Sequence, residues 1–205
     1  MNKFVIFDFD GTLADTFELG SKLLNSYAQE FGYKEIDFEK HKNSSAKELI
    51  KLSGVRFWKI PHLLRFFRKK SQEKADEIKP FSGIIDLIKQ LKKENYKLGI
   101  ITTNSSQTID TFIKINGLEE YFSFIKTEVS LFGKKRALKK ASRLNGDFLY
   151  IGDELRDIEA CNAAKKKIIS VSWGFNSFEI LKKNNSFVAK NTQELYDLIT
   201  IFSKQ

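Results

Sequence analysis

Two carboxylates closely follow a short apolar stretch near the start of the chain. Asp8 and Asp10 come after the apolar residues 4–7, and Gly11 and Thr12 follow them. The apolar stretch predicts a buried strand, and a carboxylate at its end is costly to bury unless it is paired, hydrogen-bonded or bound to a metal ion. Because open α/β sheets bind ligands beyond the carboxyl ends of their strands, the pattern predicts a site built from carboxylates and a metal ion.

Three further patterns place polar residues at an expected strand end or helix start. The first follows the largely apolar residues 98–101, the second precedes an expected helix, and the third follows the apolar residues 148–151. Their polar members are Thr102, Thr103 and Asn104, then Lys134 and Lys135, then Asp153, Glu154, Arg156 and Asp157. Each pattern alone is weakly specific, but all four in this order indicate one composite site.

The acidic members of these patterns are suited to Mg²⁺. This ion prefers oxygen ligands in octahedral geometry and retains several of its waters. We therefore take Asp8, Asp10, Asp153 and Asp157 as the candidate metal ligands. Asp157 lies one helical turn beyond Asp153 and would act through water.

These residues are carried by an alternation of strand-like and helix-like segments. Strands are expected at 3–7, 97–101, 122–126, 148–152, 167–172 and 187–189. Helices are expected after Pro80 and at 107–115, 135–144, 156–164, 178–183 and 192–202. Ser82 is the expected N-cap of the first of these helices, and Thr192 that of the last. The alternation predicts an α/β fold with a doubly wound, Rossmann-like parallel sheet that has helices on both faces.

One long segment interrupts this alternation. Residues 15–79 are rich in helical patterns and contain no convincing strand. We predict that they form an all-helical cap subdomain over the strand ends. The cap would be inserted into an α/β core made of residues 1–14 and 80–205.

A polar loop within the predicted cap offers candidate substrate contacts. Lys42 and Ser45 are the residues that we select from it, because the loop precedes an amphipathic helix. The alternative is purely structural. In that interpretation Ser44 or Ser45 is an N-cap and Glu48 completes a capping box.

A second stretch of the predicted cap mixes aromatic and basic side chains. Such a mixture at 55–70 would suit a groove for nucleic acid, where bases stack on aromatic rings. However, its apolar residues recur at helical spacing, which favours packing against neighbouring helices. These residues are Leu63, Leu64, Phe66 and Phe67.

Composition narrows the class of protein. The chain has 205 residues, a net charge of +9 and one cysteine, Cys161. Its basic residues are spread along helices and interleaved with acids, which favours a solvated surface and small anionic ligands over nucleic acid. We expect a cytoplasmic protein without a membrane segment, because the sequence has neither a long apolar run nor a signal-peptide pattern. The linear pattern does not indicate an oligomeric state.

In order and spacing, the four patterns resemble the motifs of the haloacid dehalogenase-like hydrolase superfamily, in its phosphatase branch with a helical cap. The segment 171–176 is similar to phosphoglycolate phosphatase-like members. The resemblance covers nearly the whole chain. It implies an Mg²⁺-dependent phosphatase that hydrolyses a small phosphorylated metabolite through an aspartyl phosphate on Asp8.

The resemblance also implies roles for individual residues. Asp8 is the nucleophile, and Asp10 is the general acid and then the general base, with its backbone carbonyl on the metal. Asp10 favours phosphate chemistry, because dehalogenases of the family lack a carboxylate at this position. Asp153 is the better direct metal ligand, and Lys134, or its neighbour Lys135, supplies the cation that offsets the charge of Asp8 and the phosphoryl group.

Other positions complete the predicted phosphate site. Thr102, or its neighbour Thr103, would hold phosphoryl oxygens with its hydroxyl and nearby backbone N–H groups. Asn104 either adds an amide contact or caps the loop, and Thr12 adds a hydroxyl contact. Glu154 lies beside the metal or in solvent, and Arg156 is expected to pair with a nearby acid.

Two other functions fit the same sequence. A phosphomutase or phosphotransferase shares the aspartyl phosphate and differs only in the acceptor of the phosphoryl group. A non-catalytic basic binding module would account for the net charge and the basic, aromatic stretch. Phosphoglycolate is a candidate substrate, but the predicted cap and not the core would set specificity.

Overall fold

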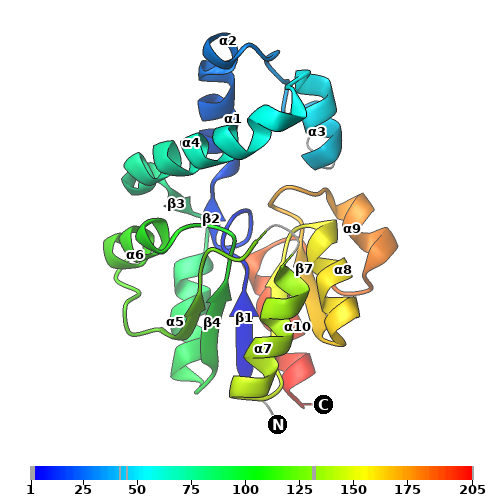
Figure 1. Ribbon diagram of the computed structural model, residues 1–205. Helices are drawn as coiled ribbons and strands as arrows, with labels where there is room; N and C mark the ends of the chain where they lie inside the picture. Colours follow the sequence, from blue (N-terminus) through cyan, green and yellow to red (C-terminus); the bar gives the residue numbers. More distant parts are fainter. Residues whose placement is uncertain (1–2, 42, 45, 131–132, 205) are drawn as a thin grey trace.

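A six-stranded parallel sheet forms the centre of the molecule (Figure 1). The computed structural model describes residues 3–41, 43–44, 46–130 and 133–204. The strand order is β5-β4-β1-β6-β7-β8, so β1, the first strand in the chain, lies inside the sheet. The strands are β1 (Phe4–Phe7), β4 (Lys97–Ile101), β5 (Phe122–Lys126), β6 (Leu149–Gly152), β7 (Lys167–Val171) and β8 (Val188–Ala189). The α/β fold class predicted from the sequence is confirmed.

Helices cover both faces of the sheet. They are α5 (Ile84–Lys93), α6 (Ser106–Ile115), α7 (Lys134–Asn145), α8 (Leu155–Ala164), α9 (Phe178–Asn184) and α10 (Thr192–Lys204). Alternate residues of β1 point to opposite faces, as expected for a strand. Val5 and Phe7 pack with α5, α6 and α10, whereas Phe4 and Ile6 pack with α7, α8 and α9. Burial on both faces explains why the strand is apolar without alternation.

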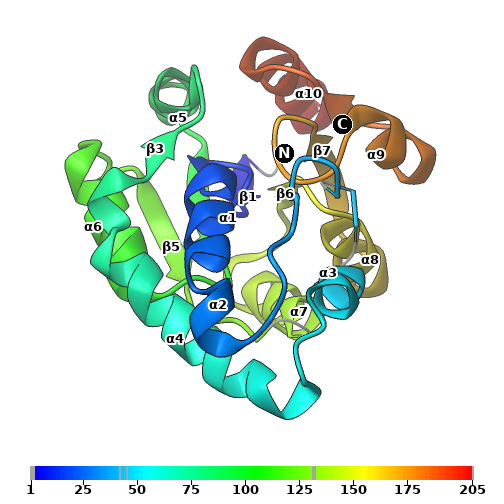
Figure 2. The same cartoon turned by 90° about the horizontal axis from the view of Figure 1, so that it is seen from above.

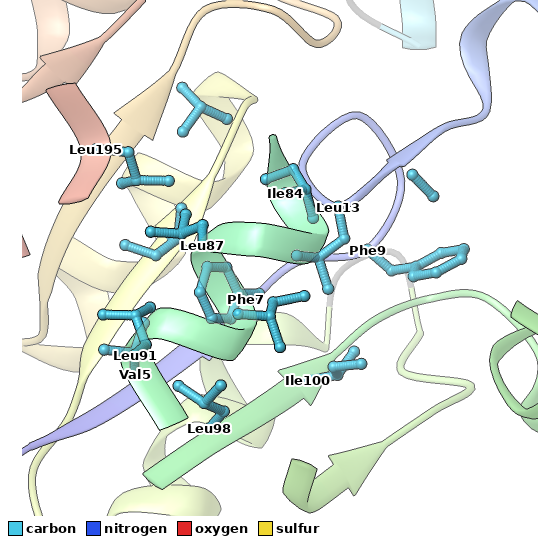
Figure 3. Close-up of a cluster of buried hydrophobic side chains, with 14 of the residues drawn as sticks. Val5, Phe7, Phe9, Leu13, Ile84, Leu87, Leu91, Leu98, Ile100 and Leu195 are labelled. Carbon is cyan, nitrogen blue, oxygen red and sulfur yellow. The ribbon is translucent and has the colours of Figure 1, made fainter. Parts of the chain in front are cut away.

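Helix α5 illustrates how the sequence sets this packing (Figure 3). Its buried residues Ile84, Leu87, Ile88 and Leu91 recur at helical spacing and form one stripe. The stripe faces the same core cluster as Phe7 of β1. The helix expected after Pro80 is therefore confirmed.

The register of the central strands places their carboxyl ends side by side. Phe7 of β1 pairs with Ile100 of β4 and with Ile151 of β6. The residues that follow each strand consequently emerge at one edge of the sheet. This alignment brings together sequence motifs that lie far apart in the chain.

A helical segment lies beyond this edge (Figures 1 and 2). It contains α1 (Phe17–Ser26), α2 (Ala28–Phe31), α3 (Ala46–Ser53), η1 (Phe57–Lys59), α4 (Ile60–Glu73) and η2 (Ala75–Glu77). We call residues 16–78 the helical segment. Its two roots form a short antiparallel pair, β2 (Ala14–Asp15) with β3 (Lys79–Pro80), so the prediction that 15–79 contains no strand is wrong at both ends. The proposed division into a cap and a core stays a prediction.

Aromatic packing holds the helical segment together. Tyr27 and Phe31 contact Phe66 of α4 at ring-centroid distances of 4.8 and 4.9 Å. Leu63 is buried, but Leu64 is 62% exposed, so the prediction that Leu64 packs against a neighbour is wrong. None of the helices in the described residues is both long and apolar enough to cross a membrane.

The caps of two helices differ from the prediction. Gly83 and not Ser82 precedes α5, because the chain turns there with φ of 76°. Asn191 and not Thr192 caps α10, since its Oδ1 accepts the N–H of Glu194 at 2.9 Å. Thr192 instead lies against Gly83, where an added Cβ would come within 2.5 Å of its Oγ1. The tertiary contact between the two helix starts thus determines which residue caps each helix.

Two glycine-to-alanine substitutions are expected to change stability in opposite directions. Gly83→Ala should lower the free energy of unfolding by about 1–2 kcal/mol, because the left-handed backbone is strained for any residue with a Cβ. Gly20→Ala should raise it by about 0.5–1 kcal/mol, because Gly20 lies in α1 with open space around it. Urea denaturation measures both values. A stabilising Gly83→Ala would contradict this account of the turn.

Candidate active site

Three aspartates meet at the carboxyl edge of the sheet. Asp8 directly follows β1, Asp153 follows β6, and Asp157 lies in the first turn of α8. One carboxylate oxygen from each lies within 4.8 Å of the others, and all three side chains are buried. Buried carboxylates at this separation repel one another unless a cation lies among them.

Lys134 supplies one such positive charge. It is the first residue of α7, and its Nζ lies 2.6 Å from Oδ2 of Asp8 and 2.5 Å from Oδ1 of Asp157. Only 4% of Lys134 is exposed, whereas its neighbour Lys135 lies on the surface. Between these two alternatives, the structure brings Lys134 to the aspartates. Three carboxylates and one ammonium group leave a net charge of −2 when all are ionised.

Burial perturbs the proton affinity of these groups. The pKa of Asp8 is raised from 3.8 to about 7, chiefly because burial disfavours its charged form; Lys134 opposes this shift and Asp157 adds to it. The pKa of Asp153 is raised well above its usual value by burial and by the charges of Glu154 and Asp157. The pKa of Lys134 is also raised, because Asp157 and Asp8 together outweigh the effect of its burial.

Two hydrogen bonds orient Asp153. The Thr12 hydroxyl donates to its Oδ1 at 2.9 Å, and the Phe175 backbone N–H donates to its Oδ2 at 2.8 Å. Thr12 is therefore beside the aspartates, as a contact of Asp153. Gly11, with φ of 74°, allows the close approach, because an added Cβ there would lie 2.2 Å from Oδ2 of Asp153.

Asp10 lies at the side of the cluster. Asn104 Nδ2 donates to its Oδ1 at 3.0 Å, and the Thr102 hydroxyl donates to its Oδ2 at 3.5 Å. Its carboxylate is therefore separate from the three that meet at the strand ends. The structure thus joins the second sequence pattern to the first through Asp10.

The polar residues after β4 also hold their own loop. Thr102 is fully buried, and its Oγ1 accepts the N–H of Asn104 at 2.9 Å, whereas Thr103 is half-buried. Asn104 Oδ1 accepts the N–H of Ser105 at 2.8 Å. Asn104 therefore makes both predicted kinds of contact, one through its amide group to Asp10 and one that caps the loop.

Glu154 and Arg156 form an ion pair at the rim. Their charged atoms lie 2.5 Å apart, and their side chains are 21% and 32% exposed. The predicted pairing of Arg156 with a nearby acid is confirmed. Glu154 is only partly exposed, and its negative charge raises the pKa of Asp153. Glu154 is therefore neither fully in solvent nor one of the three clustered aspartates' immediate group, so neither predicted position, beside the metal or in solvent, describes it fully.

A divalent cation fits the donor set. Three buried carboxylates gather oxygen ligands, and their net charge with Lys134 is equal and opposite to that of Mg²⁺. A bound cation would also favour the ionised forms that burial alone disfavours. Asp8 and Asp153 would hold the ion, with Asp157 beside them.

The sequence patterns missed one part of the site. The loop 172–177 after β7 contributes the Phe175 N–H to Asp153 and the Trp173 Nε1–H to the backbone oxygen of Thr12 at 3.1 Å. Its only signal in the sequence was the likeness of 171–176 to phosphoglycolate phosphatase-like proteins, because a backbone donor leaves no trace in residue type. Two predicted substrate contacts, Lys42 and Ser45, lie outside the described residues.

Comparison with known proteins identifies the family of the chain. Residues 5–171 match the family model for haloacid dehalogenase-like hydrolases. The chain is 32% identical over 184 residues to phosphoglycolate phosphatase of Synechococcus elongatus, covering 86% of this chain and 87% of that one. It is 29% identical over 183 residues to pyrophosphatase PpaX of Bacillus cereus, covering 82% of each.

Solved structures share the fold. A crystal structure of a predicted phosphatase from Clostridium acetobutylicum has a TM-score of 0.83 at 23% identity, covering 98% of this chain and 99% of that one. A haloacid dehalogenase-like family hydrolase from Streptococcus pneumoniae has a TM-score of 0.80 at 22% identity, covering 96% and 98%. The chain belongs to the haloacid dehalogenase-like hydrolase family. It is a phosphatase of that family.

Removal of Lys134 should separate its role from that of Lys135. Lys134→Met should lower the free energy of unfolding of the metal-free protein by about 3 kcal/mol at mildly alkaline pH, because it leaves the buried carboxylates without their cation. Lys135→Met should change it by less than about 0.5 kcal/mol, because Lys135 is exposed. Urea denaturation provides the comparison. Equal effects of the two substitutions would contradict the assignment.

The affinity for Mg²⁺ should depend on pH. Since the pKa of Asp8 is about 7 without metal, binding must displace a proton at lower pH, and affinity should fall up to about tenfold per pH unit below pH 7. Without metal the effect is opposite. The folded state binds this proton more tightly than the unfolded chain does, so stability should fall as the pH rises from about 4 to about 7.

Isothermal titration calorimetry at several pH values measures both the affinity and the protons released. Asp8→Asn should make the pH dependence shallower without abolishing it, because the pKa of Asp153 is raised as well. An affinity that is independent of pH between about pH 5 and pH 8 would rule out this linkage.

Proposed function

We propose that the protein is an Mg²⁺-dependent phosphatase that hydrolyses a small phosphorylated metabolite through an aspartyl phosphate on Asp8. The observation that carries the proposal is the pairing of Asp8 with Lys134 at 2.6 Å beside a separate carboxylate, Asp10. This arrangement supports Asp8 as the nucleophile and Asp10 as the proton carrier. The membership of the chain in a hydrolase family with phosphatase relatives supports the same chemistry.

In the first step, Asp8 attacks phosphorus and the bond from phosphorus to the leaving oxygen breaks. Lys134 keeps Asp8 oriented and offsets the negative charge that gathers as two anions approach. Asp10 donates a proton to the leaving oxygen, which departs as an alcohol. The pair of bonds from Asn104 and Thr102 to Asp10 supports this role, because they fix the direction of its carboxylate.

In the second step, water attacks phosphorus of the aspartyl phosphate. Asp10, now ionised, accepts a proton from that water, and the bond from phosphorus to the Asp8 oxygen breaks. Asp8 is regenerated and inorganic phosphate leaves. One residue therefore serves as acid and then as base.

Mg²⁺, when bound, would neutralise charge on the phosphoryl oxygens and bring them near Asp8. The residues that would hold it are Asp8, Asp153 and the backbone carbonyl of Asp10, with Asp157 acting through water. Thr102 or Thr103, together with Asn104, would bind the phosphoryl oxygens. The half-buried Thr103 and the backbone N–H groups of this loop are suited to that contact.

Phosphoglycolate is our first candidate substrate. A relative that covers most of the chain is a phosphoglycolate phosphatase, and the next is a pyrophosphatase. Phosphoglycolate and pyrophosphate each carry a second anionic group next to the phosphoryl group. The helical segment lies over the strand ends, so we propose that it selects the substrate, with Lys42 and Ser45 as contacts. The net charge of +9 favours small anions in general.

Substitution of the two acidic residues tests the mechanism. Asp8→Asn should reduce phosphate release by about 10⁴-fold or more, because it removes the nucleophile. Asp10→Asn should reduce it by about 10²–10⁴-fold and, with p-nitrophenyl phosphate, should accumulate the phosphorylated enzyme, because this leaving group needs no acid but water still needs a base. Intact-protein mass spectrometry detects the added phosphoryl group.

The assay uses p-nitrophenyl phosphate, phosphoglycolate, pyrophosphate, sugar phosphates and nucleoside monophosphates, with and without Mg²⁺. Lys135→Met is the matched control and should retain wild-type activity. Phosphate release by Asp8→Asn at the wild-type rate would exclude an aspartyl phosphate on Asp8. Phosphoryl transfer to a sugar without release of phosphate would indicate a mutase instead.

A further inference from the structure

One loop contacts both the aspartate cluster and the helical segment. This loop, residues 172–177, follows β7 at the carboxyl edge of the sheet. Phe175 makes both kinds of contact: its backbone N–H binds the aspartate cluster, and its ring packs against the helical segment. The loop contains no residue that the proposed mechanism uses, so its contacts call for a separate explanation.

On the side of the aspartates, the loop fits closely. The Phe175 N–H donates to Oδ2 of Asp153 at 2.8 Å. An added Cβ on Gly174 would lie 2.3 Å from the same Oδ2 and 2.2 Å from the backbone oxygen of Gly11. Only a residue without a Cβ fits at this position, so the loop backbone lies directly against Asp153 and Gly11.

Two further hydrogen bonds fasten the loop to the motifs of the site. Trp173 Nε1 donates to the backbone oxygen of Thr12 at 3.1 Å, and Asn176 Oδ1 accepts the N–H of Leu155 at 2.9 Å. Leu155 begins α8, directly after the segment that carries Asp153. The loop therefore spans the two motifs that provide the carboxylates.

On the other side, the loop contacts the helical segment. The Phe175 ring packs edge-to-face on Phe17, the first residue of α1, with centroids 5.2 Å apart and an interplanar angle of 83°. The Ser177 N–H donates to Oδ1 of Asn43 at 2.8 Å. Both Phe17 and Asn43 belong to the helical segment.

We propose that Phe175 is a positioning residue that couples the location of the helical segment to the metal site through Asp153. When the helical segment lies over the strand ends, Phe17 and Asn43 hold the loop, and the loop holds Asp153 in place. When the segment moves away, the loop loses both contacts and the Phe175 N–H holds Asp153 less firmly, while the Thr12 hydroxyl keeps its bond to Oδ1. This inference rests on the proposed function, since it takes Asp153 as a ligand of Mg²⁺.

The coupling has a reciprocal consequence. If contacts of the helical segment strengthen Mg²⁺ binding, then Mg²⁺ binding must by the same factor favour the position in which those contacts form. The metal and the helical segment would then close the site together. Closure would exclude bulk water from the site while the phosphoryl group is transferred to Asp8.

The chain provides its own optical probe for the test. It has two tryptophans, Trp173 in the loop and Trp58 in the helical segment, where it is 61% exposed. In a Trp58→Phe background, Trp173 is the single tryptophan, and Mg²⁺ titration should change its emission. Calorimetry gives the dissociation constant of Mg²⁺ independently, and neither readout requires turnover.

Phe17→Ala, Asn43→Ala and Phe175→Ala should each raise the Mg²⁺ dissociation constant by about two- to tenfold, although the Phe175 N–H is retained in all three. The double variant Phe17→Ala/Phe175→Ala should weaken binding no more than the weaker-binding single variant, because both remove the same contact. Phe57→Ala is the matched control. Phe57 is an aromatic residue of the helical segment that is 77% exposed, and its substitution should leave the dissociation constant unchanged.

The outcomes distinguish this inference from the proposed function. If the Trp58→Phe protein binds no Mg²⁺, the proposed metal site is wrong and the coupling with it. If it binds Mg²⁺ and the folded Phe17→Ala and Asn43→Ala variants bind with the same affinity, only the coupling is wrong. Asn43 is exposed, so its substitution keeps the test decisive even where Phe17→Ala unfolds the protein.

Discussion

The burial of like charges is the constraint on which the rest of the structure depends. Asp8, Asp153 and Asp157 lie within 4.8 Å of one another and are removed from water, with the ammonium group of Lys134 as their buried partner. Such an arrangement is unfavourable on its own, since each carboxylate raises the cost of ionising the next. Burial of the apolar side chains on both faces of the sheet stabilises the fold and offsets this cost. A divalent cation would remove the remaining repulsion. This donor set is therefore suited to a cation, and binding one would offset a cost that the metal-free protein carries in its stability.

Much of this arrangement could be predicted from the sequence. Apolar strands that end in polar residues, in a parallel sheet, must bring those residues to one edge, and the register of Phe7 with Ile100 and Ile151 does so. The helix and strand positions followed from apolar spacing, because each element buries a stripe or both of its faces. Local rules were less successful where two elements meet. Gly83 caps α5 and Asn191 caps α10 because the two helix starts lie against each other, and no local pattern contains that contact.

The loop 172–177 was the least predictable part of the site for a related reason. Its contribution to Asp153 is a backbone N–H, which every residue except proline carries, so residue type does not mark the position. Gly174 is informative only once its neighbours are known, because its lack of a side chain matters through Asp153 and Gly11, which lie far away in the sequence. Side-chain chemistry can be inferred from sequence patterns. Backbone donors and close approaches depend on the assembled fold.

The distribution of charge links the site to the surface around it. The protein carries a net charge of +9, yet its buried polar cluster is negative, so the positive charge lies on the outside. Lys134 is the one basic side chain that is buried among the residues the structure describes. A positive surface attracts anions over distances of about a Debye length, whereas a negative site repels them at contact. A cation in the site would remove this repulsion, so that both fields would favour the approach of an anion. A metal ion would then be needed for the site to accept an anionic substrate, before any chemistry begins.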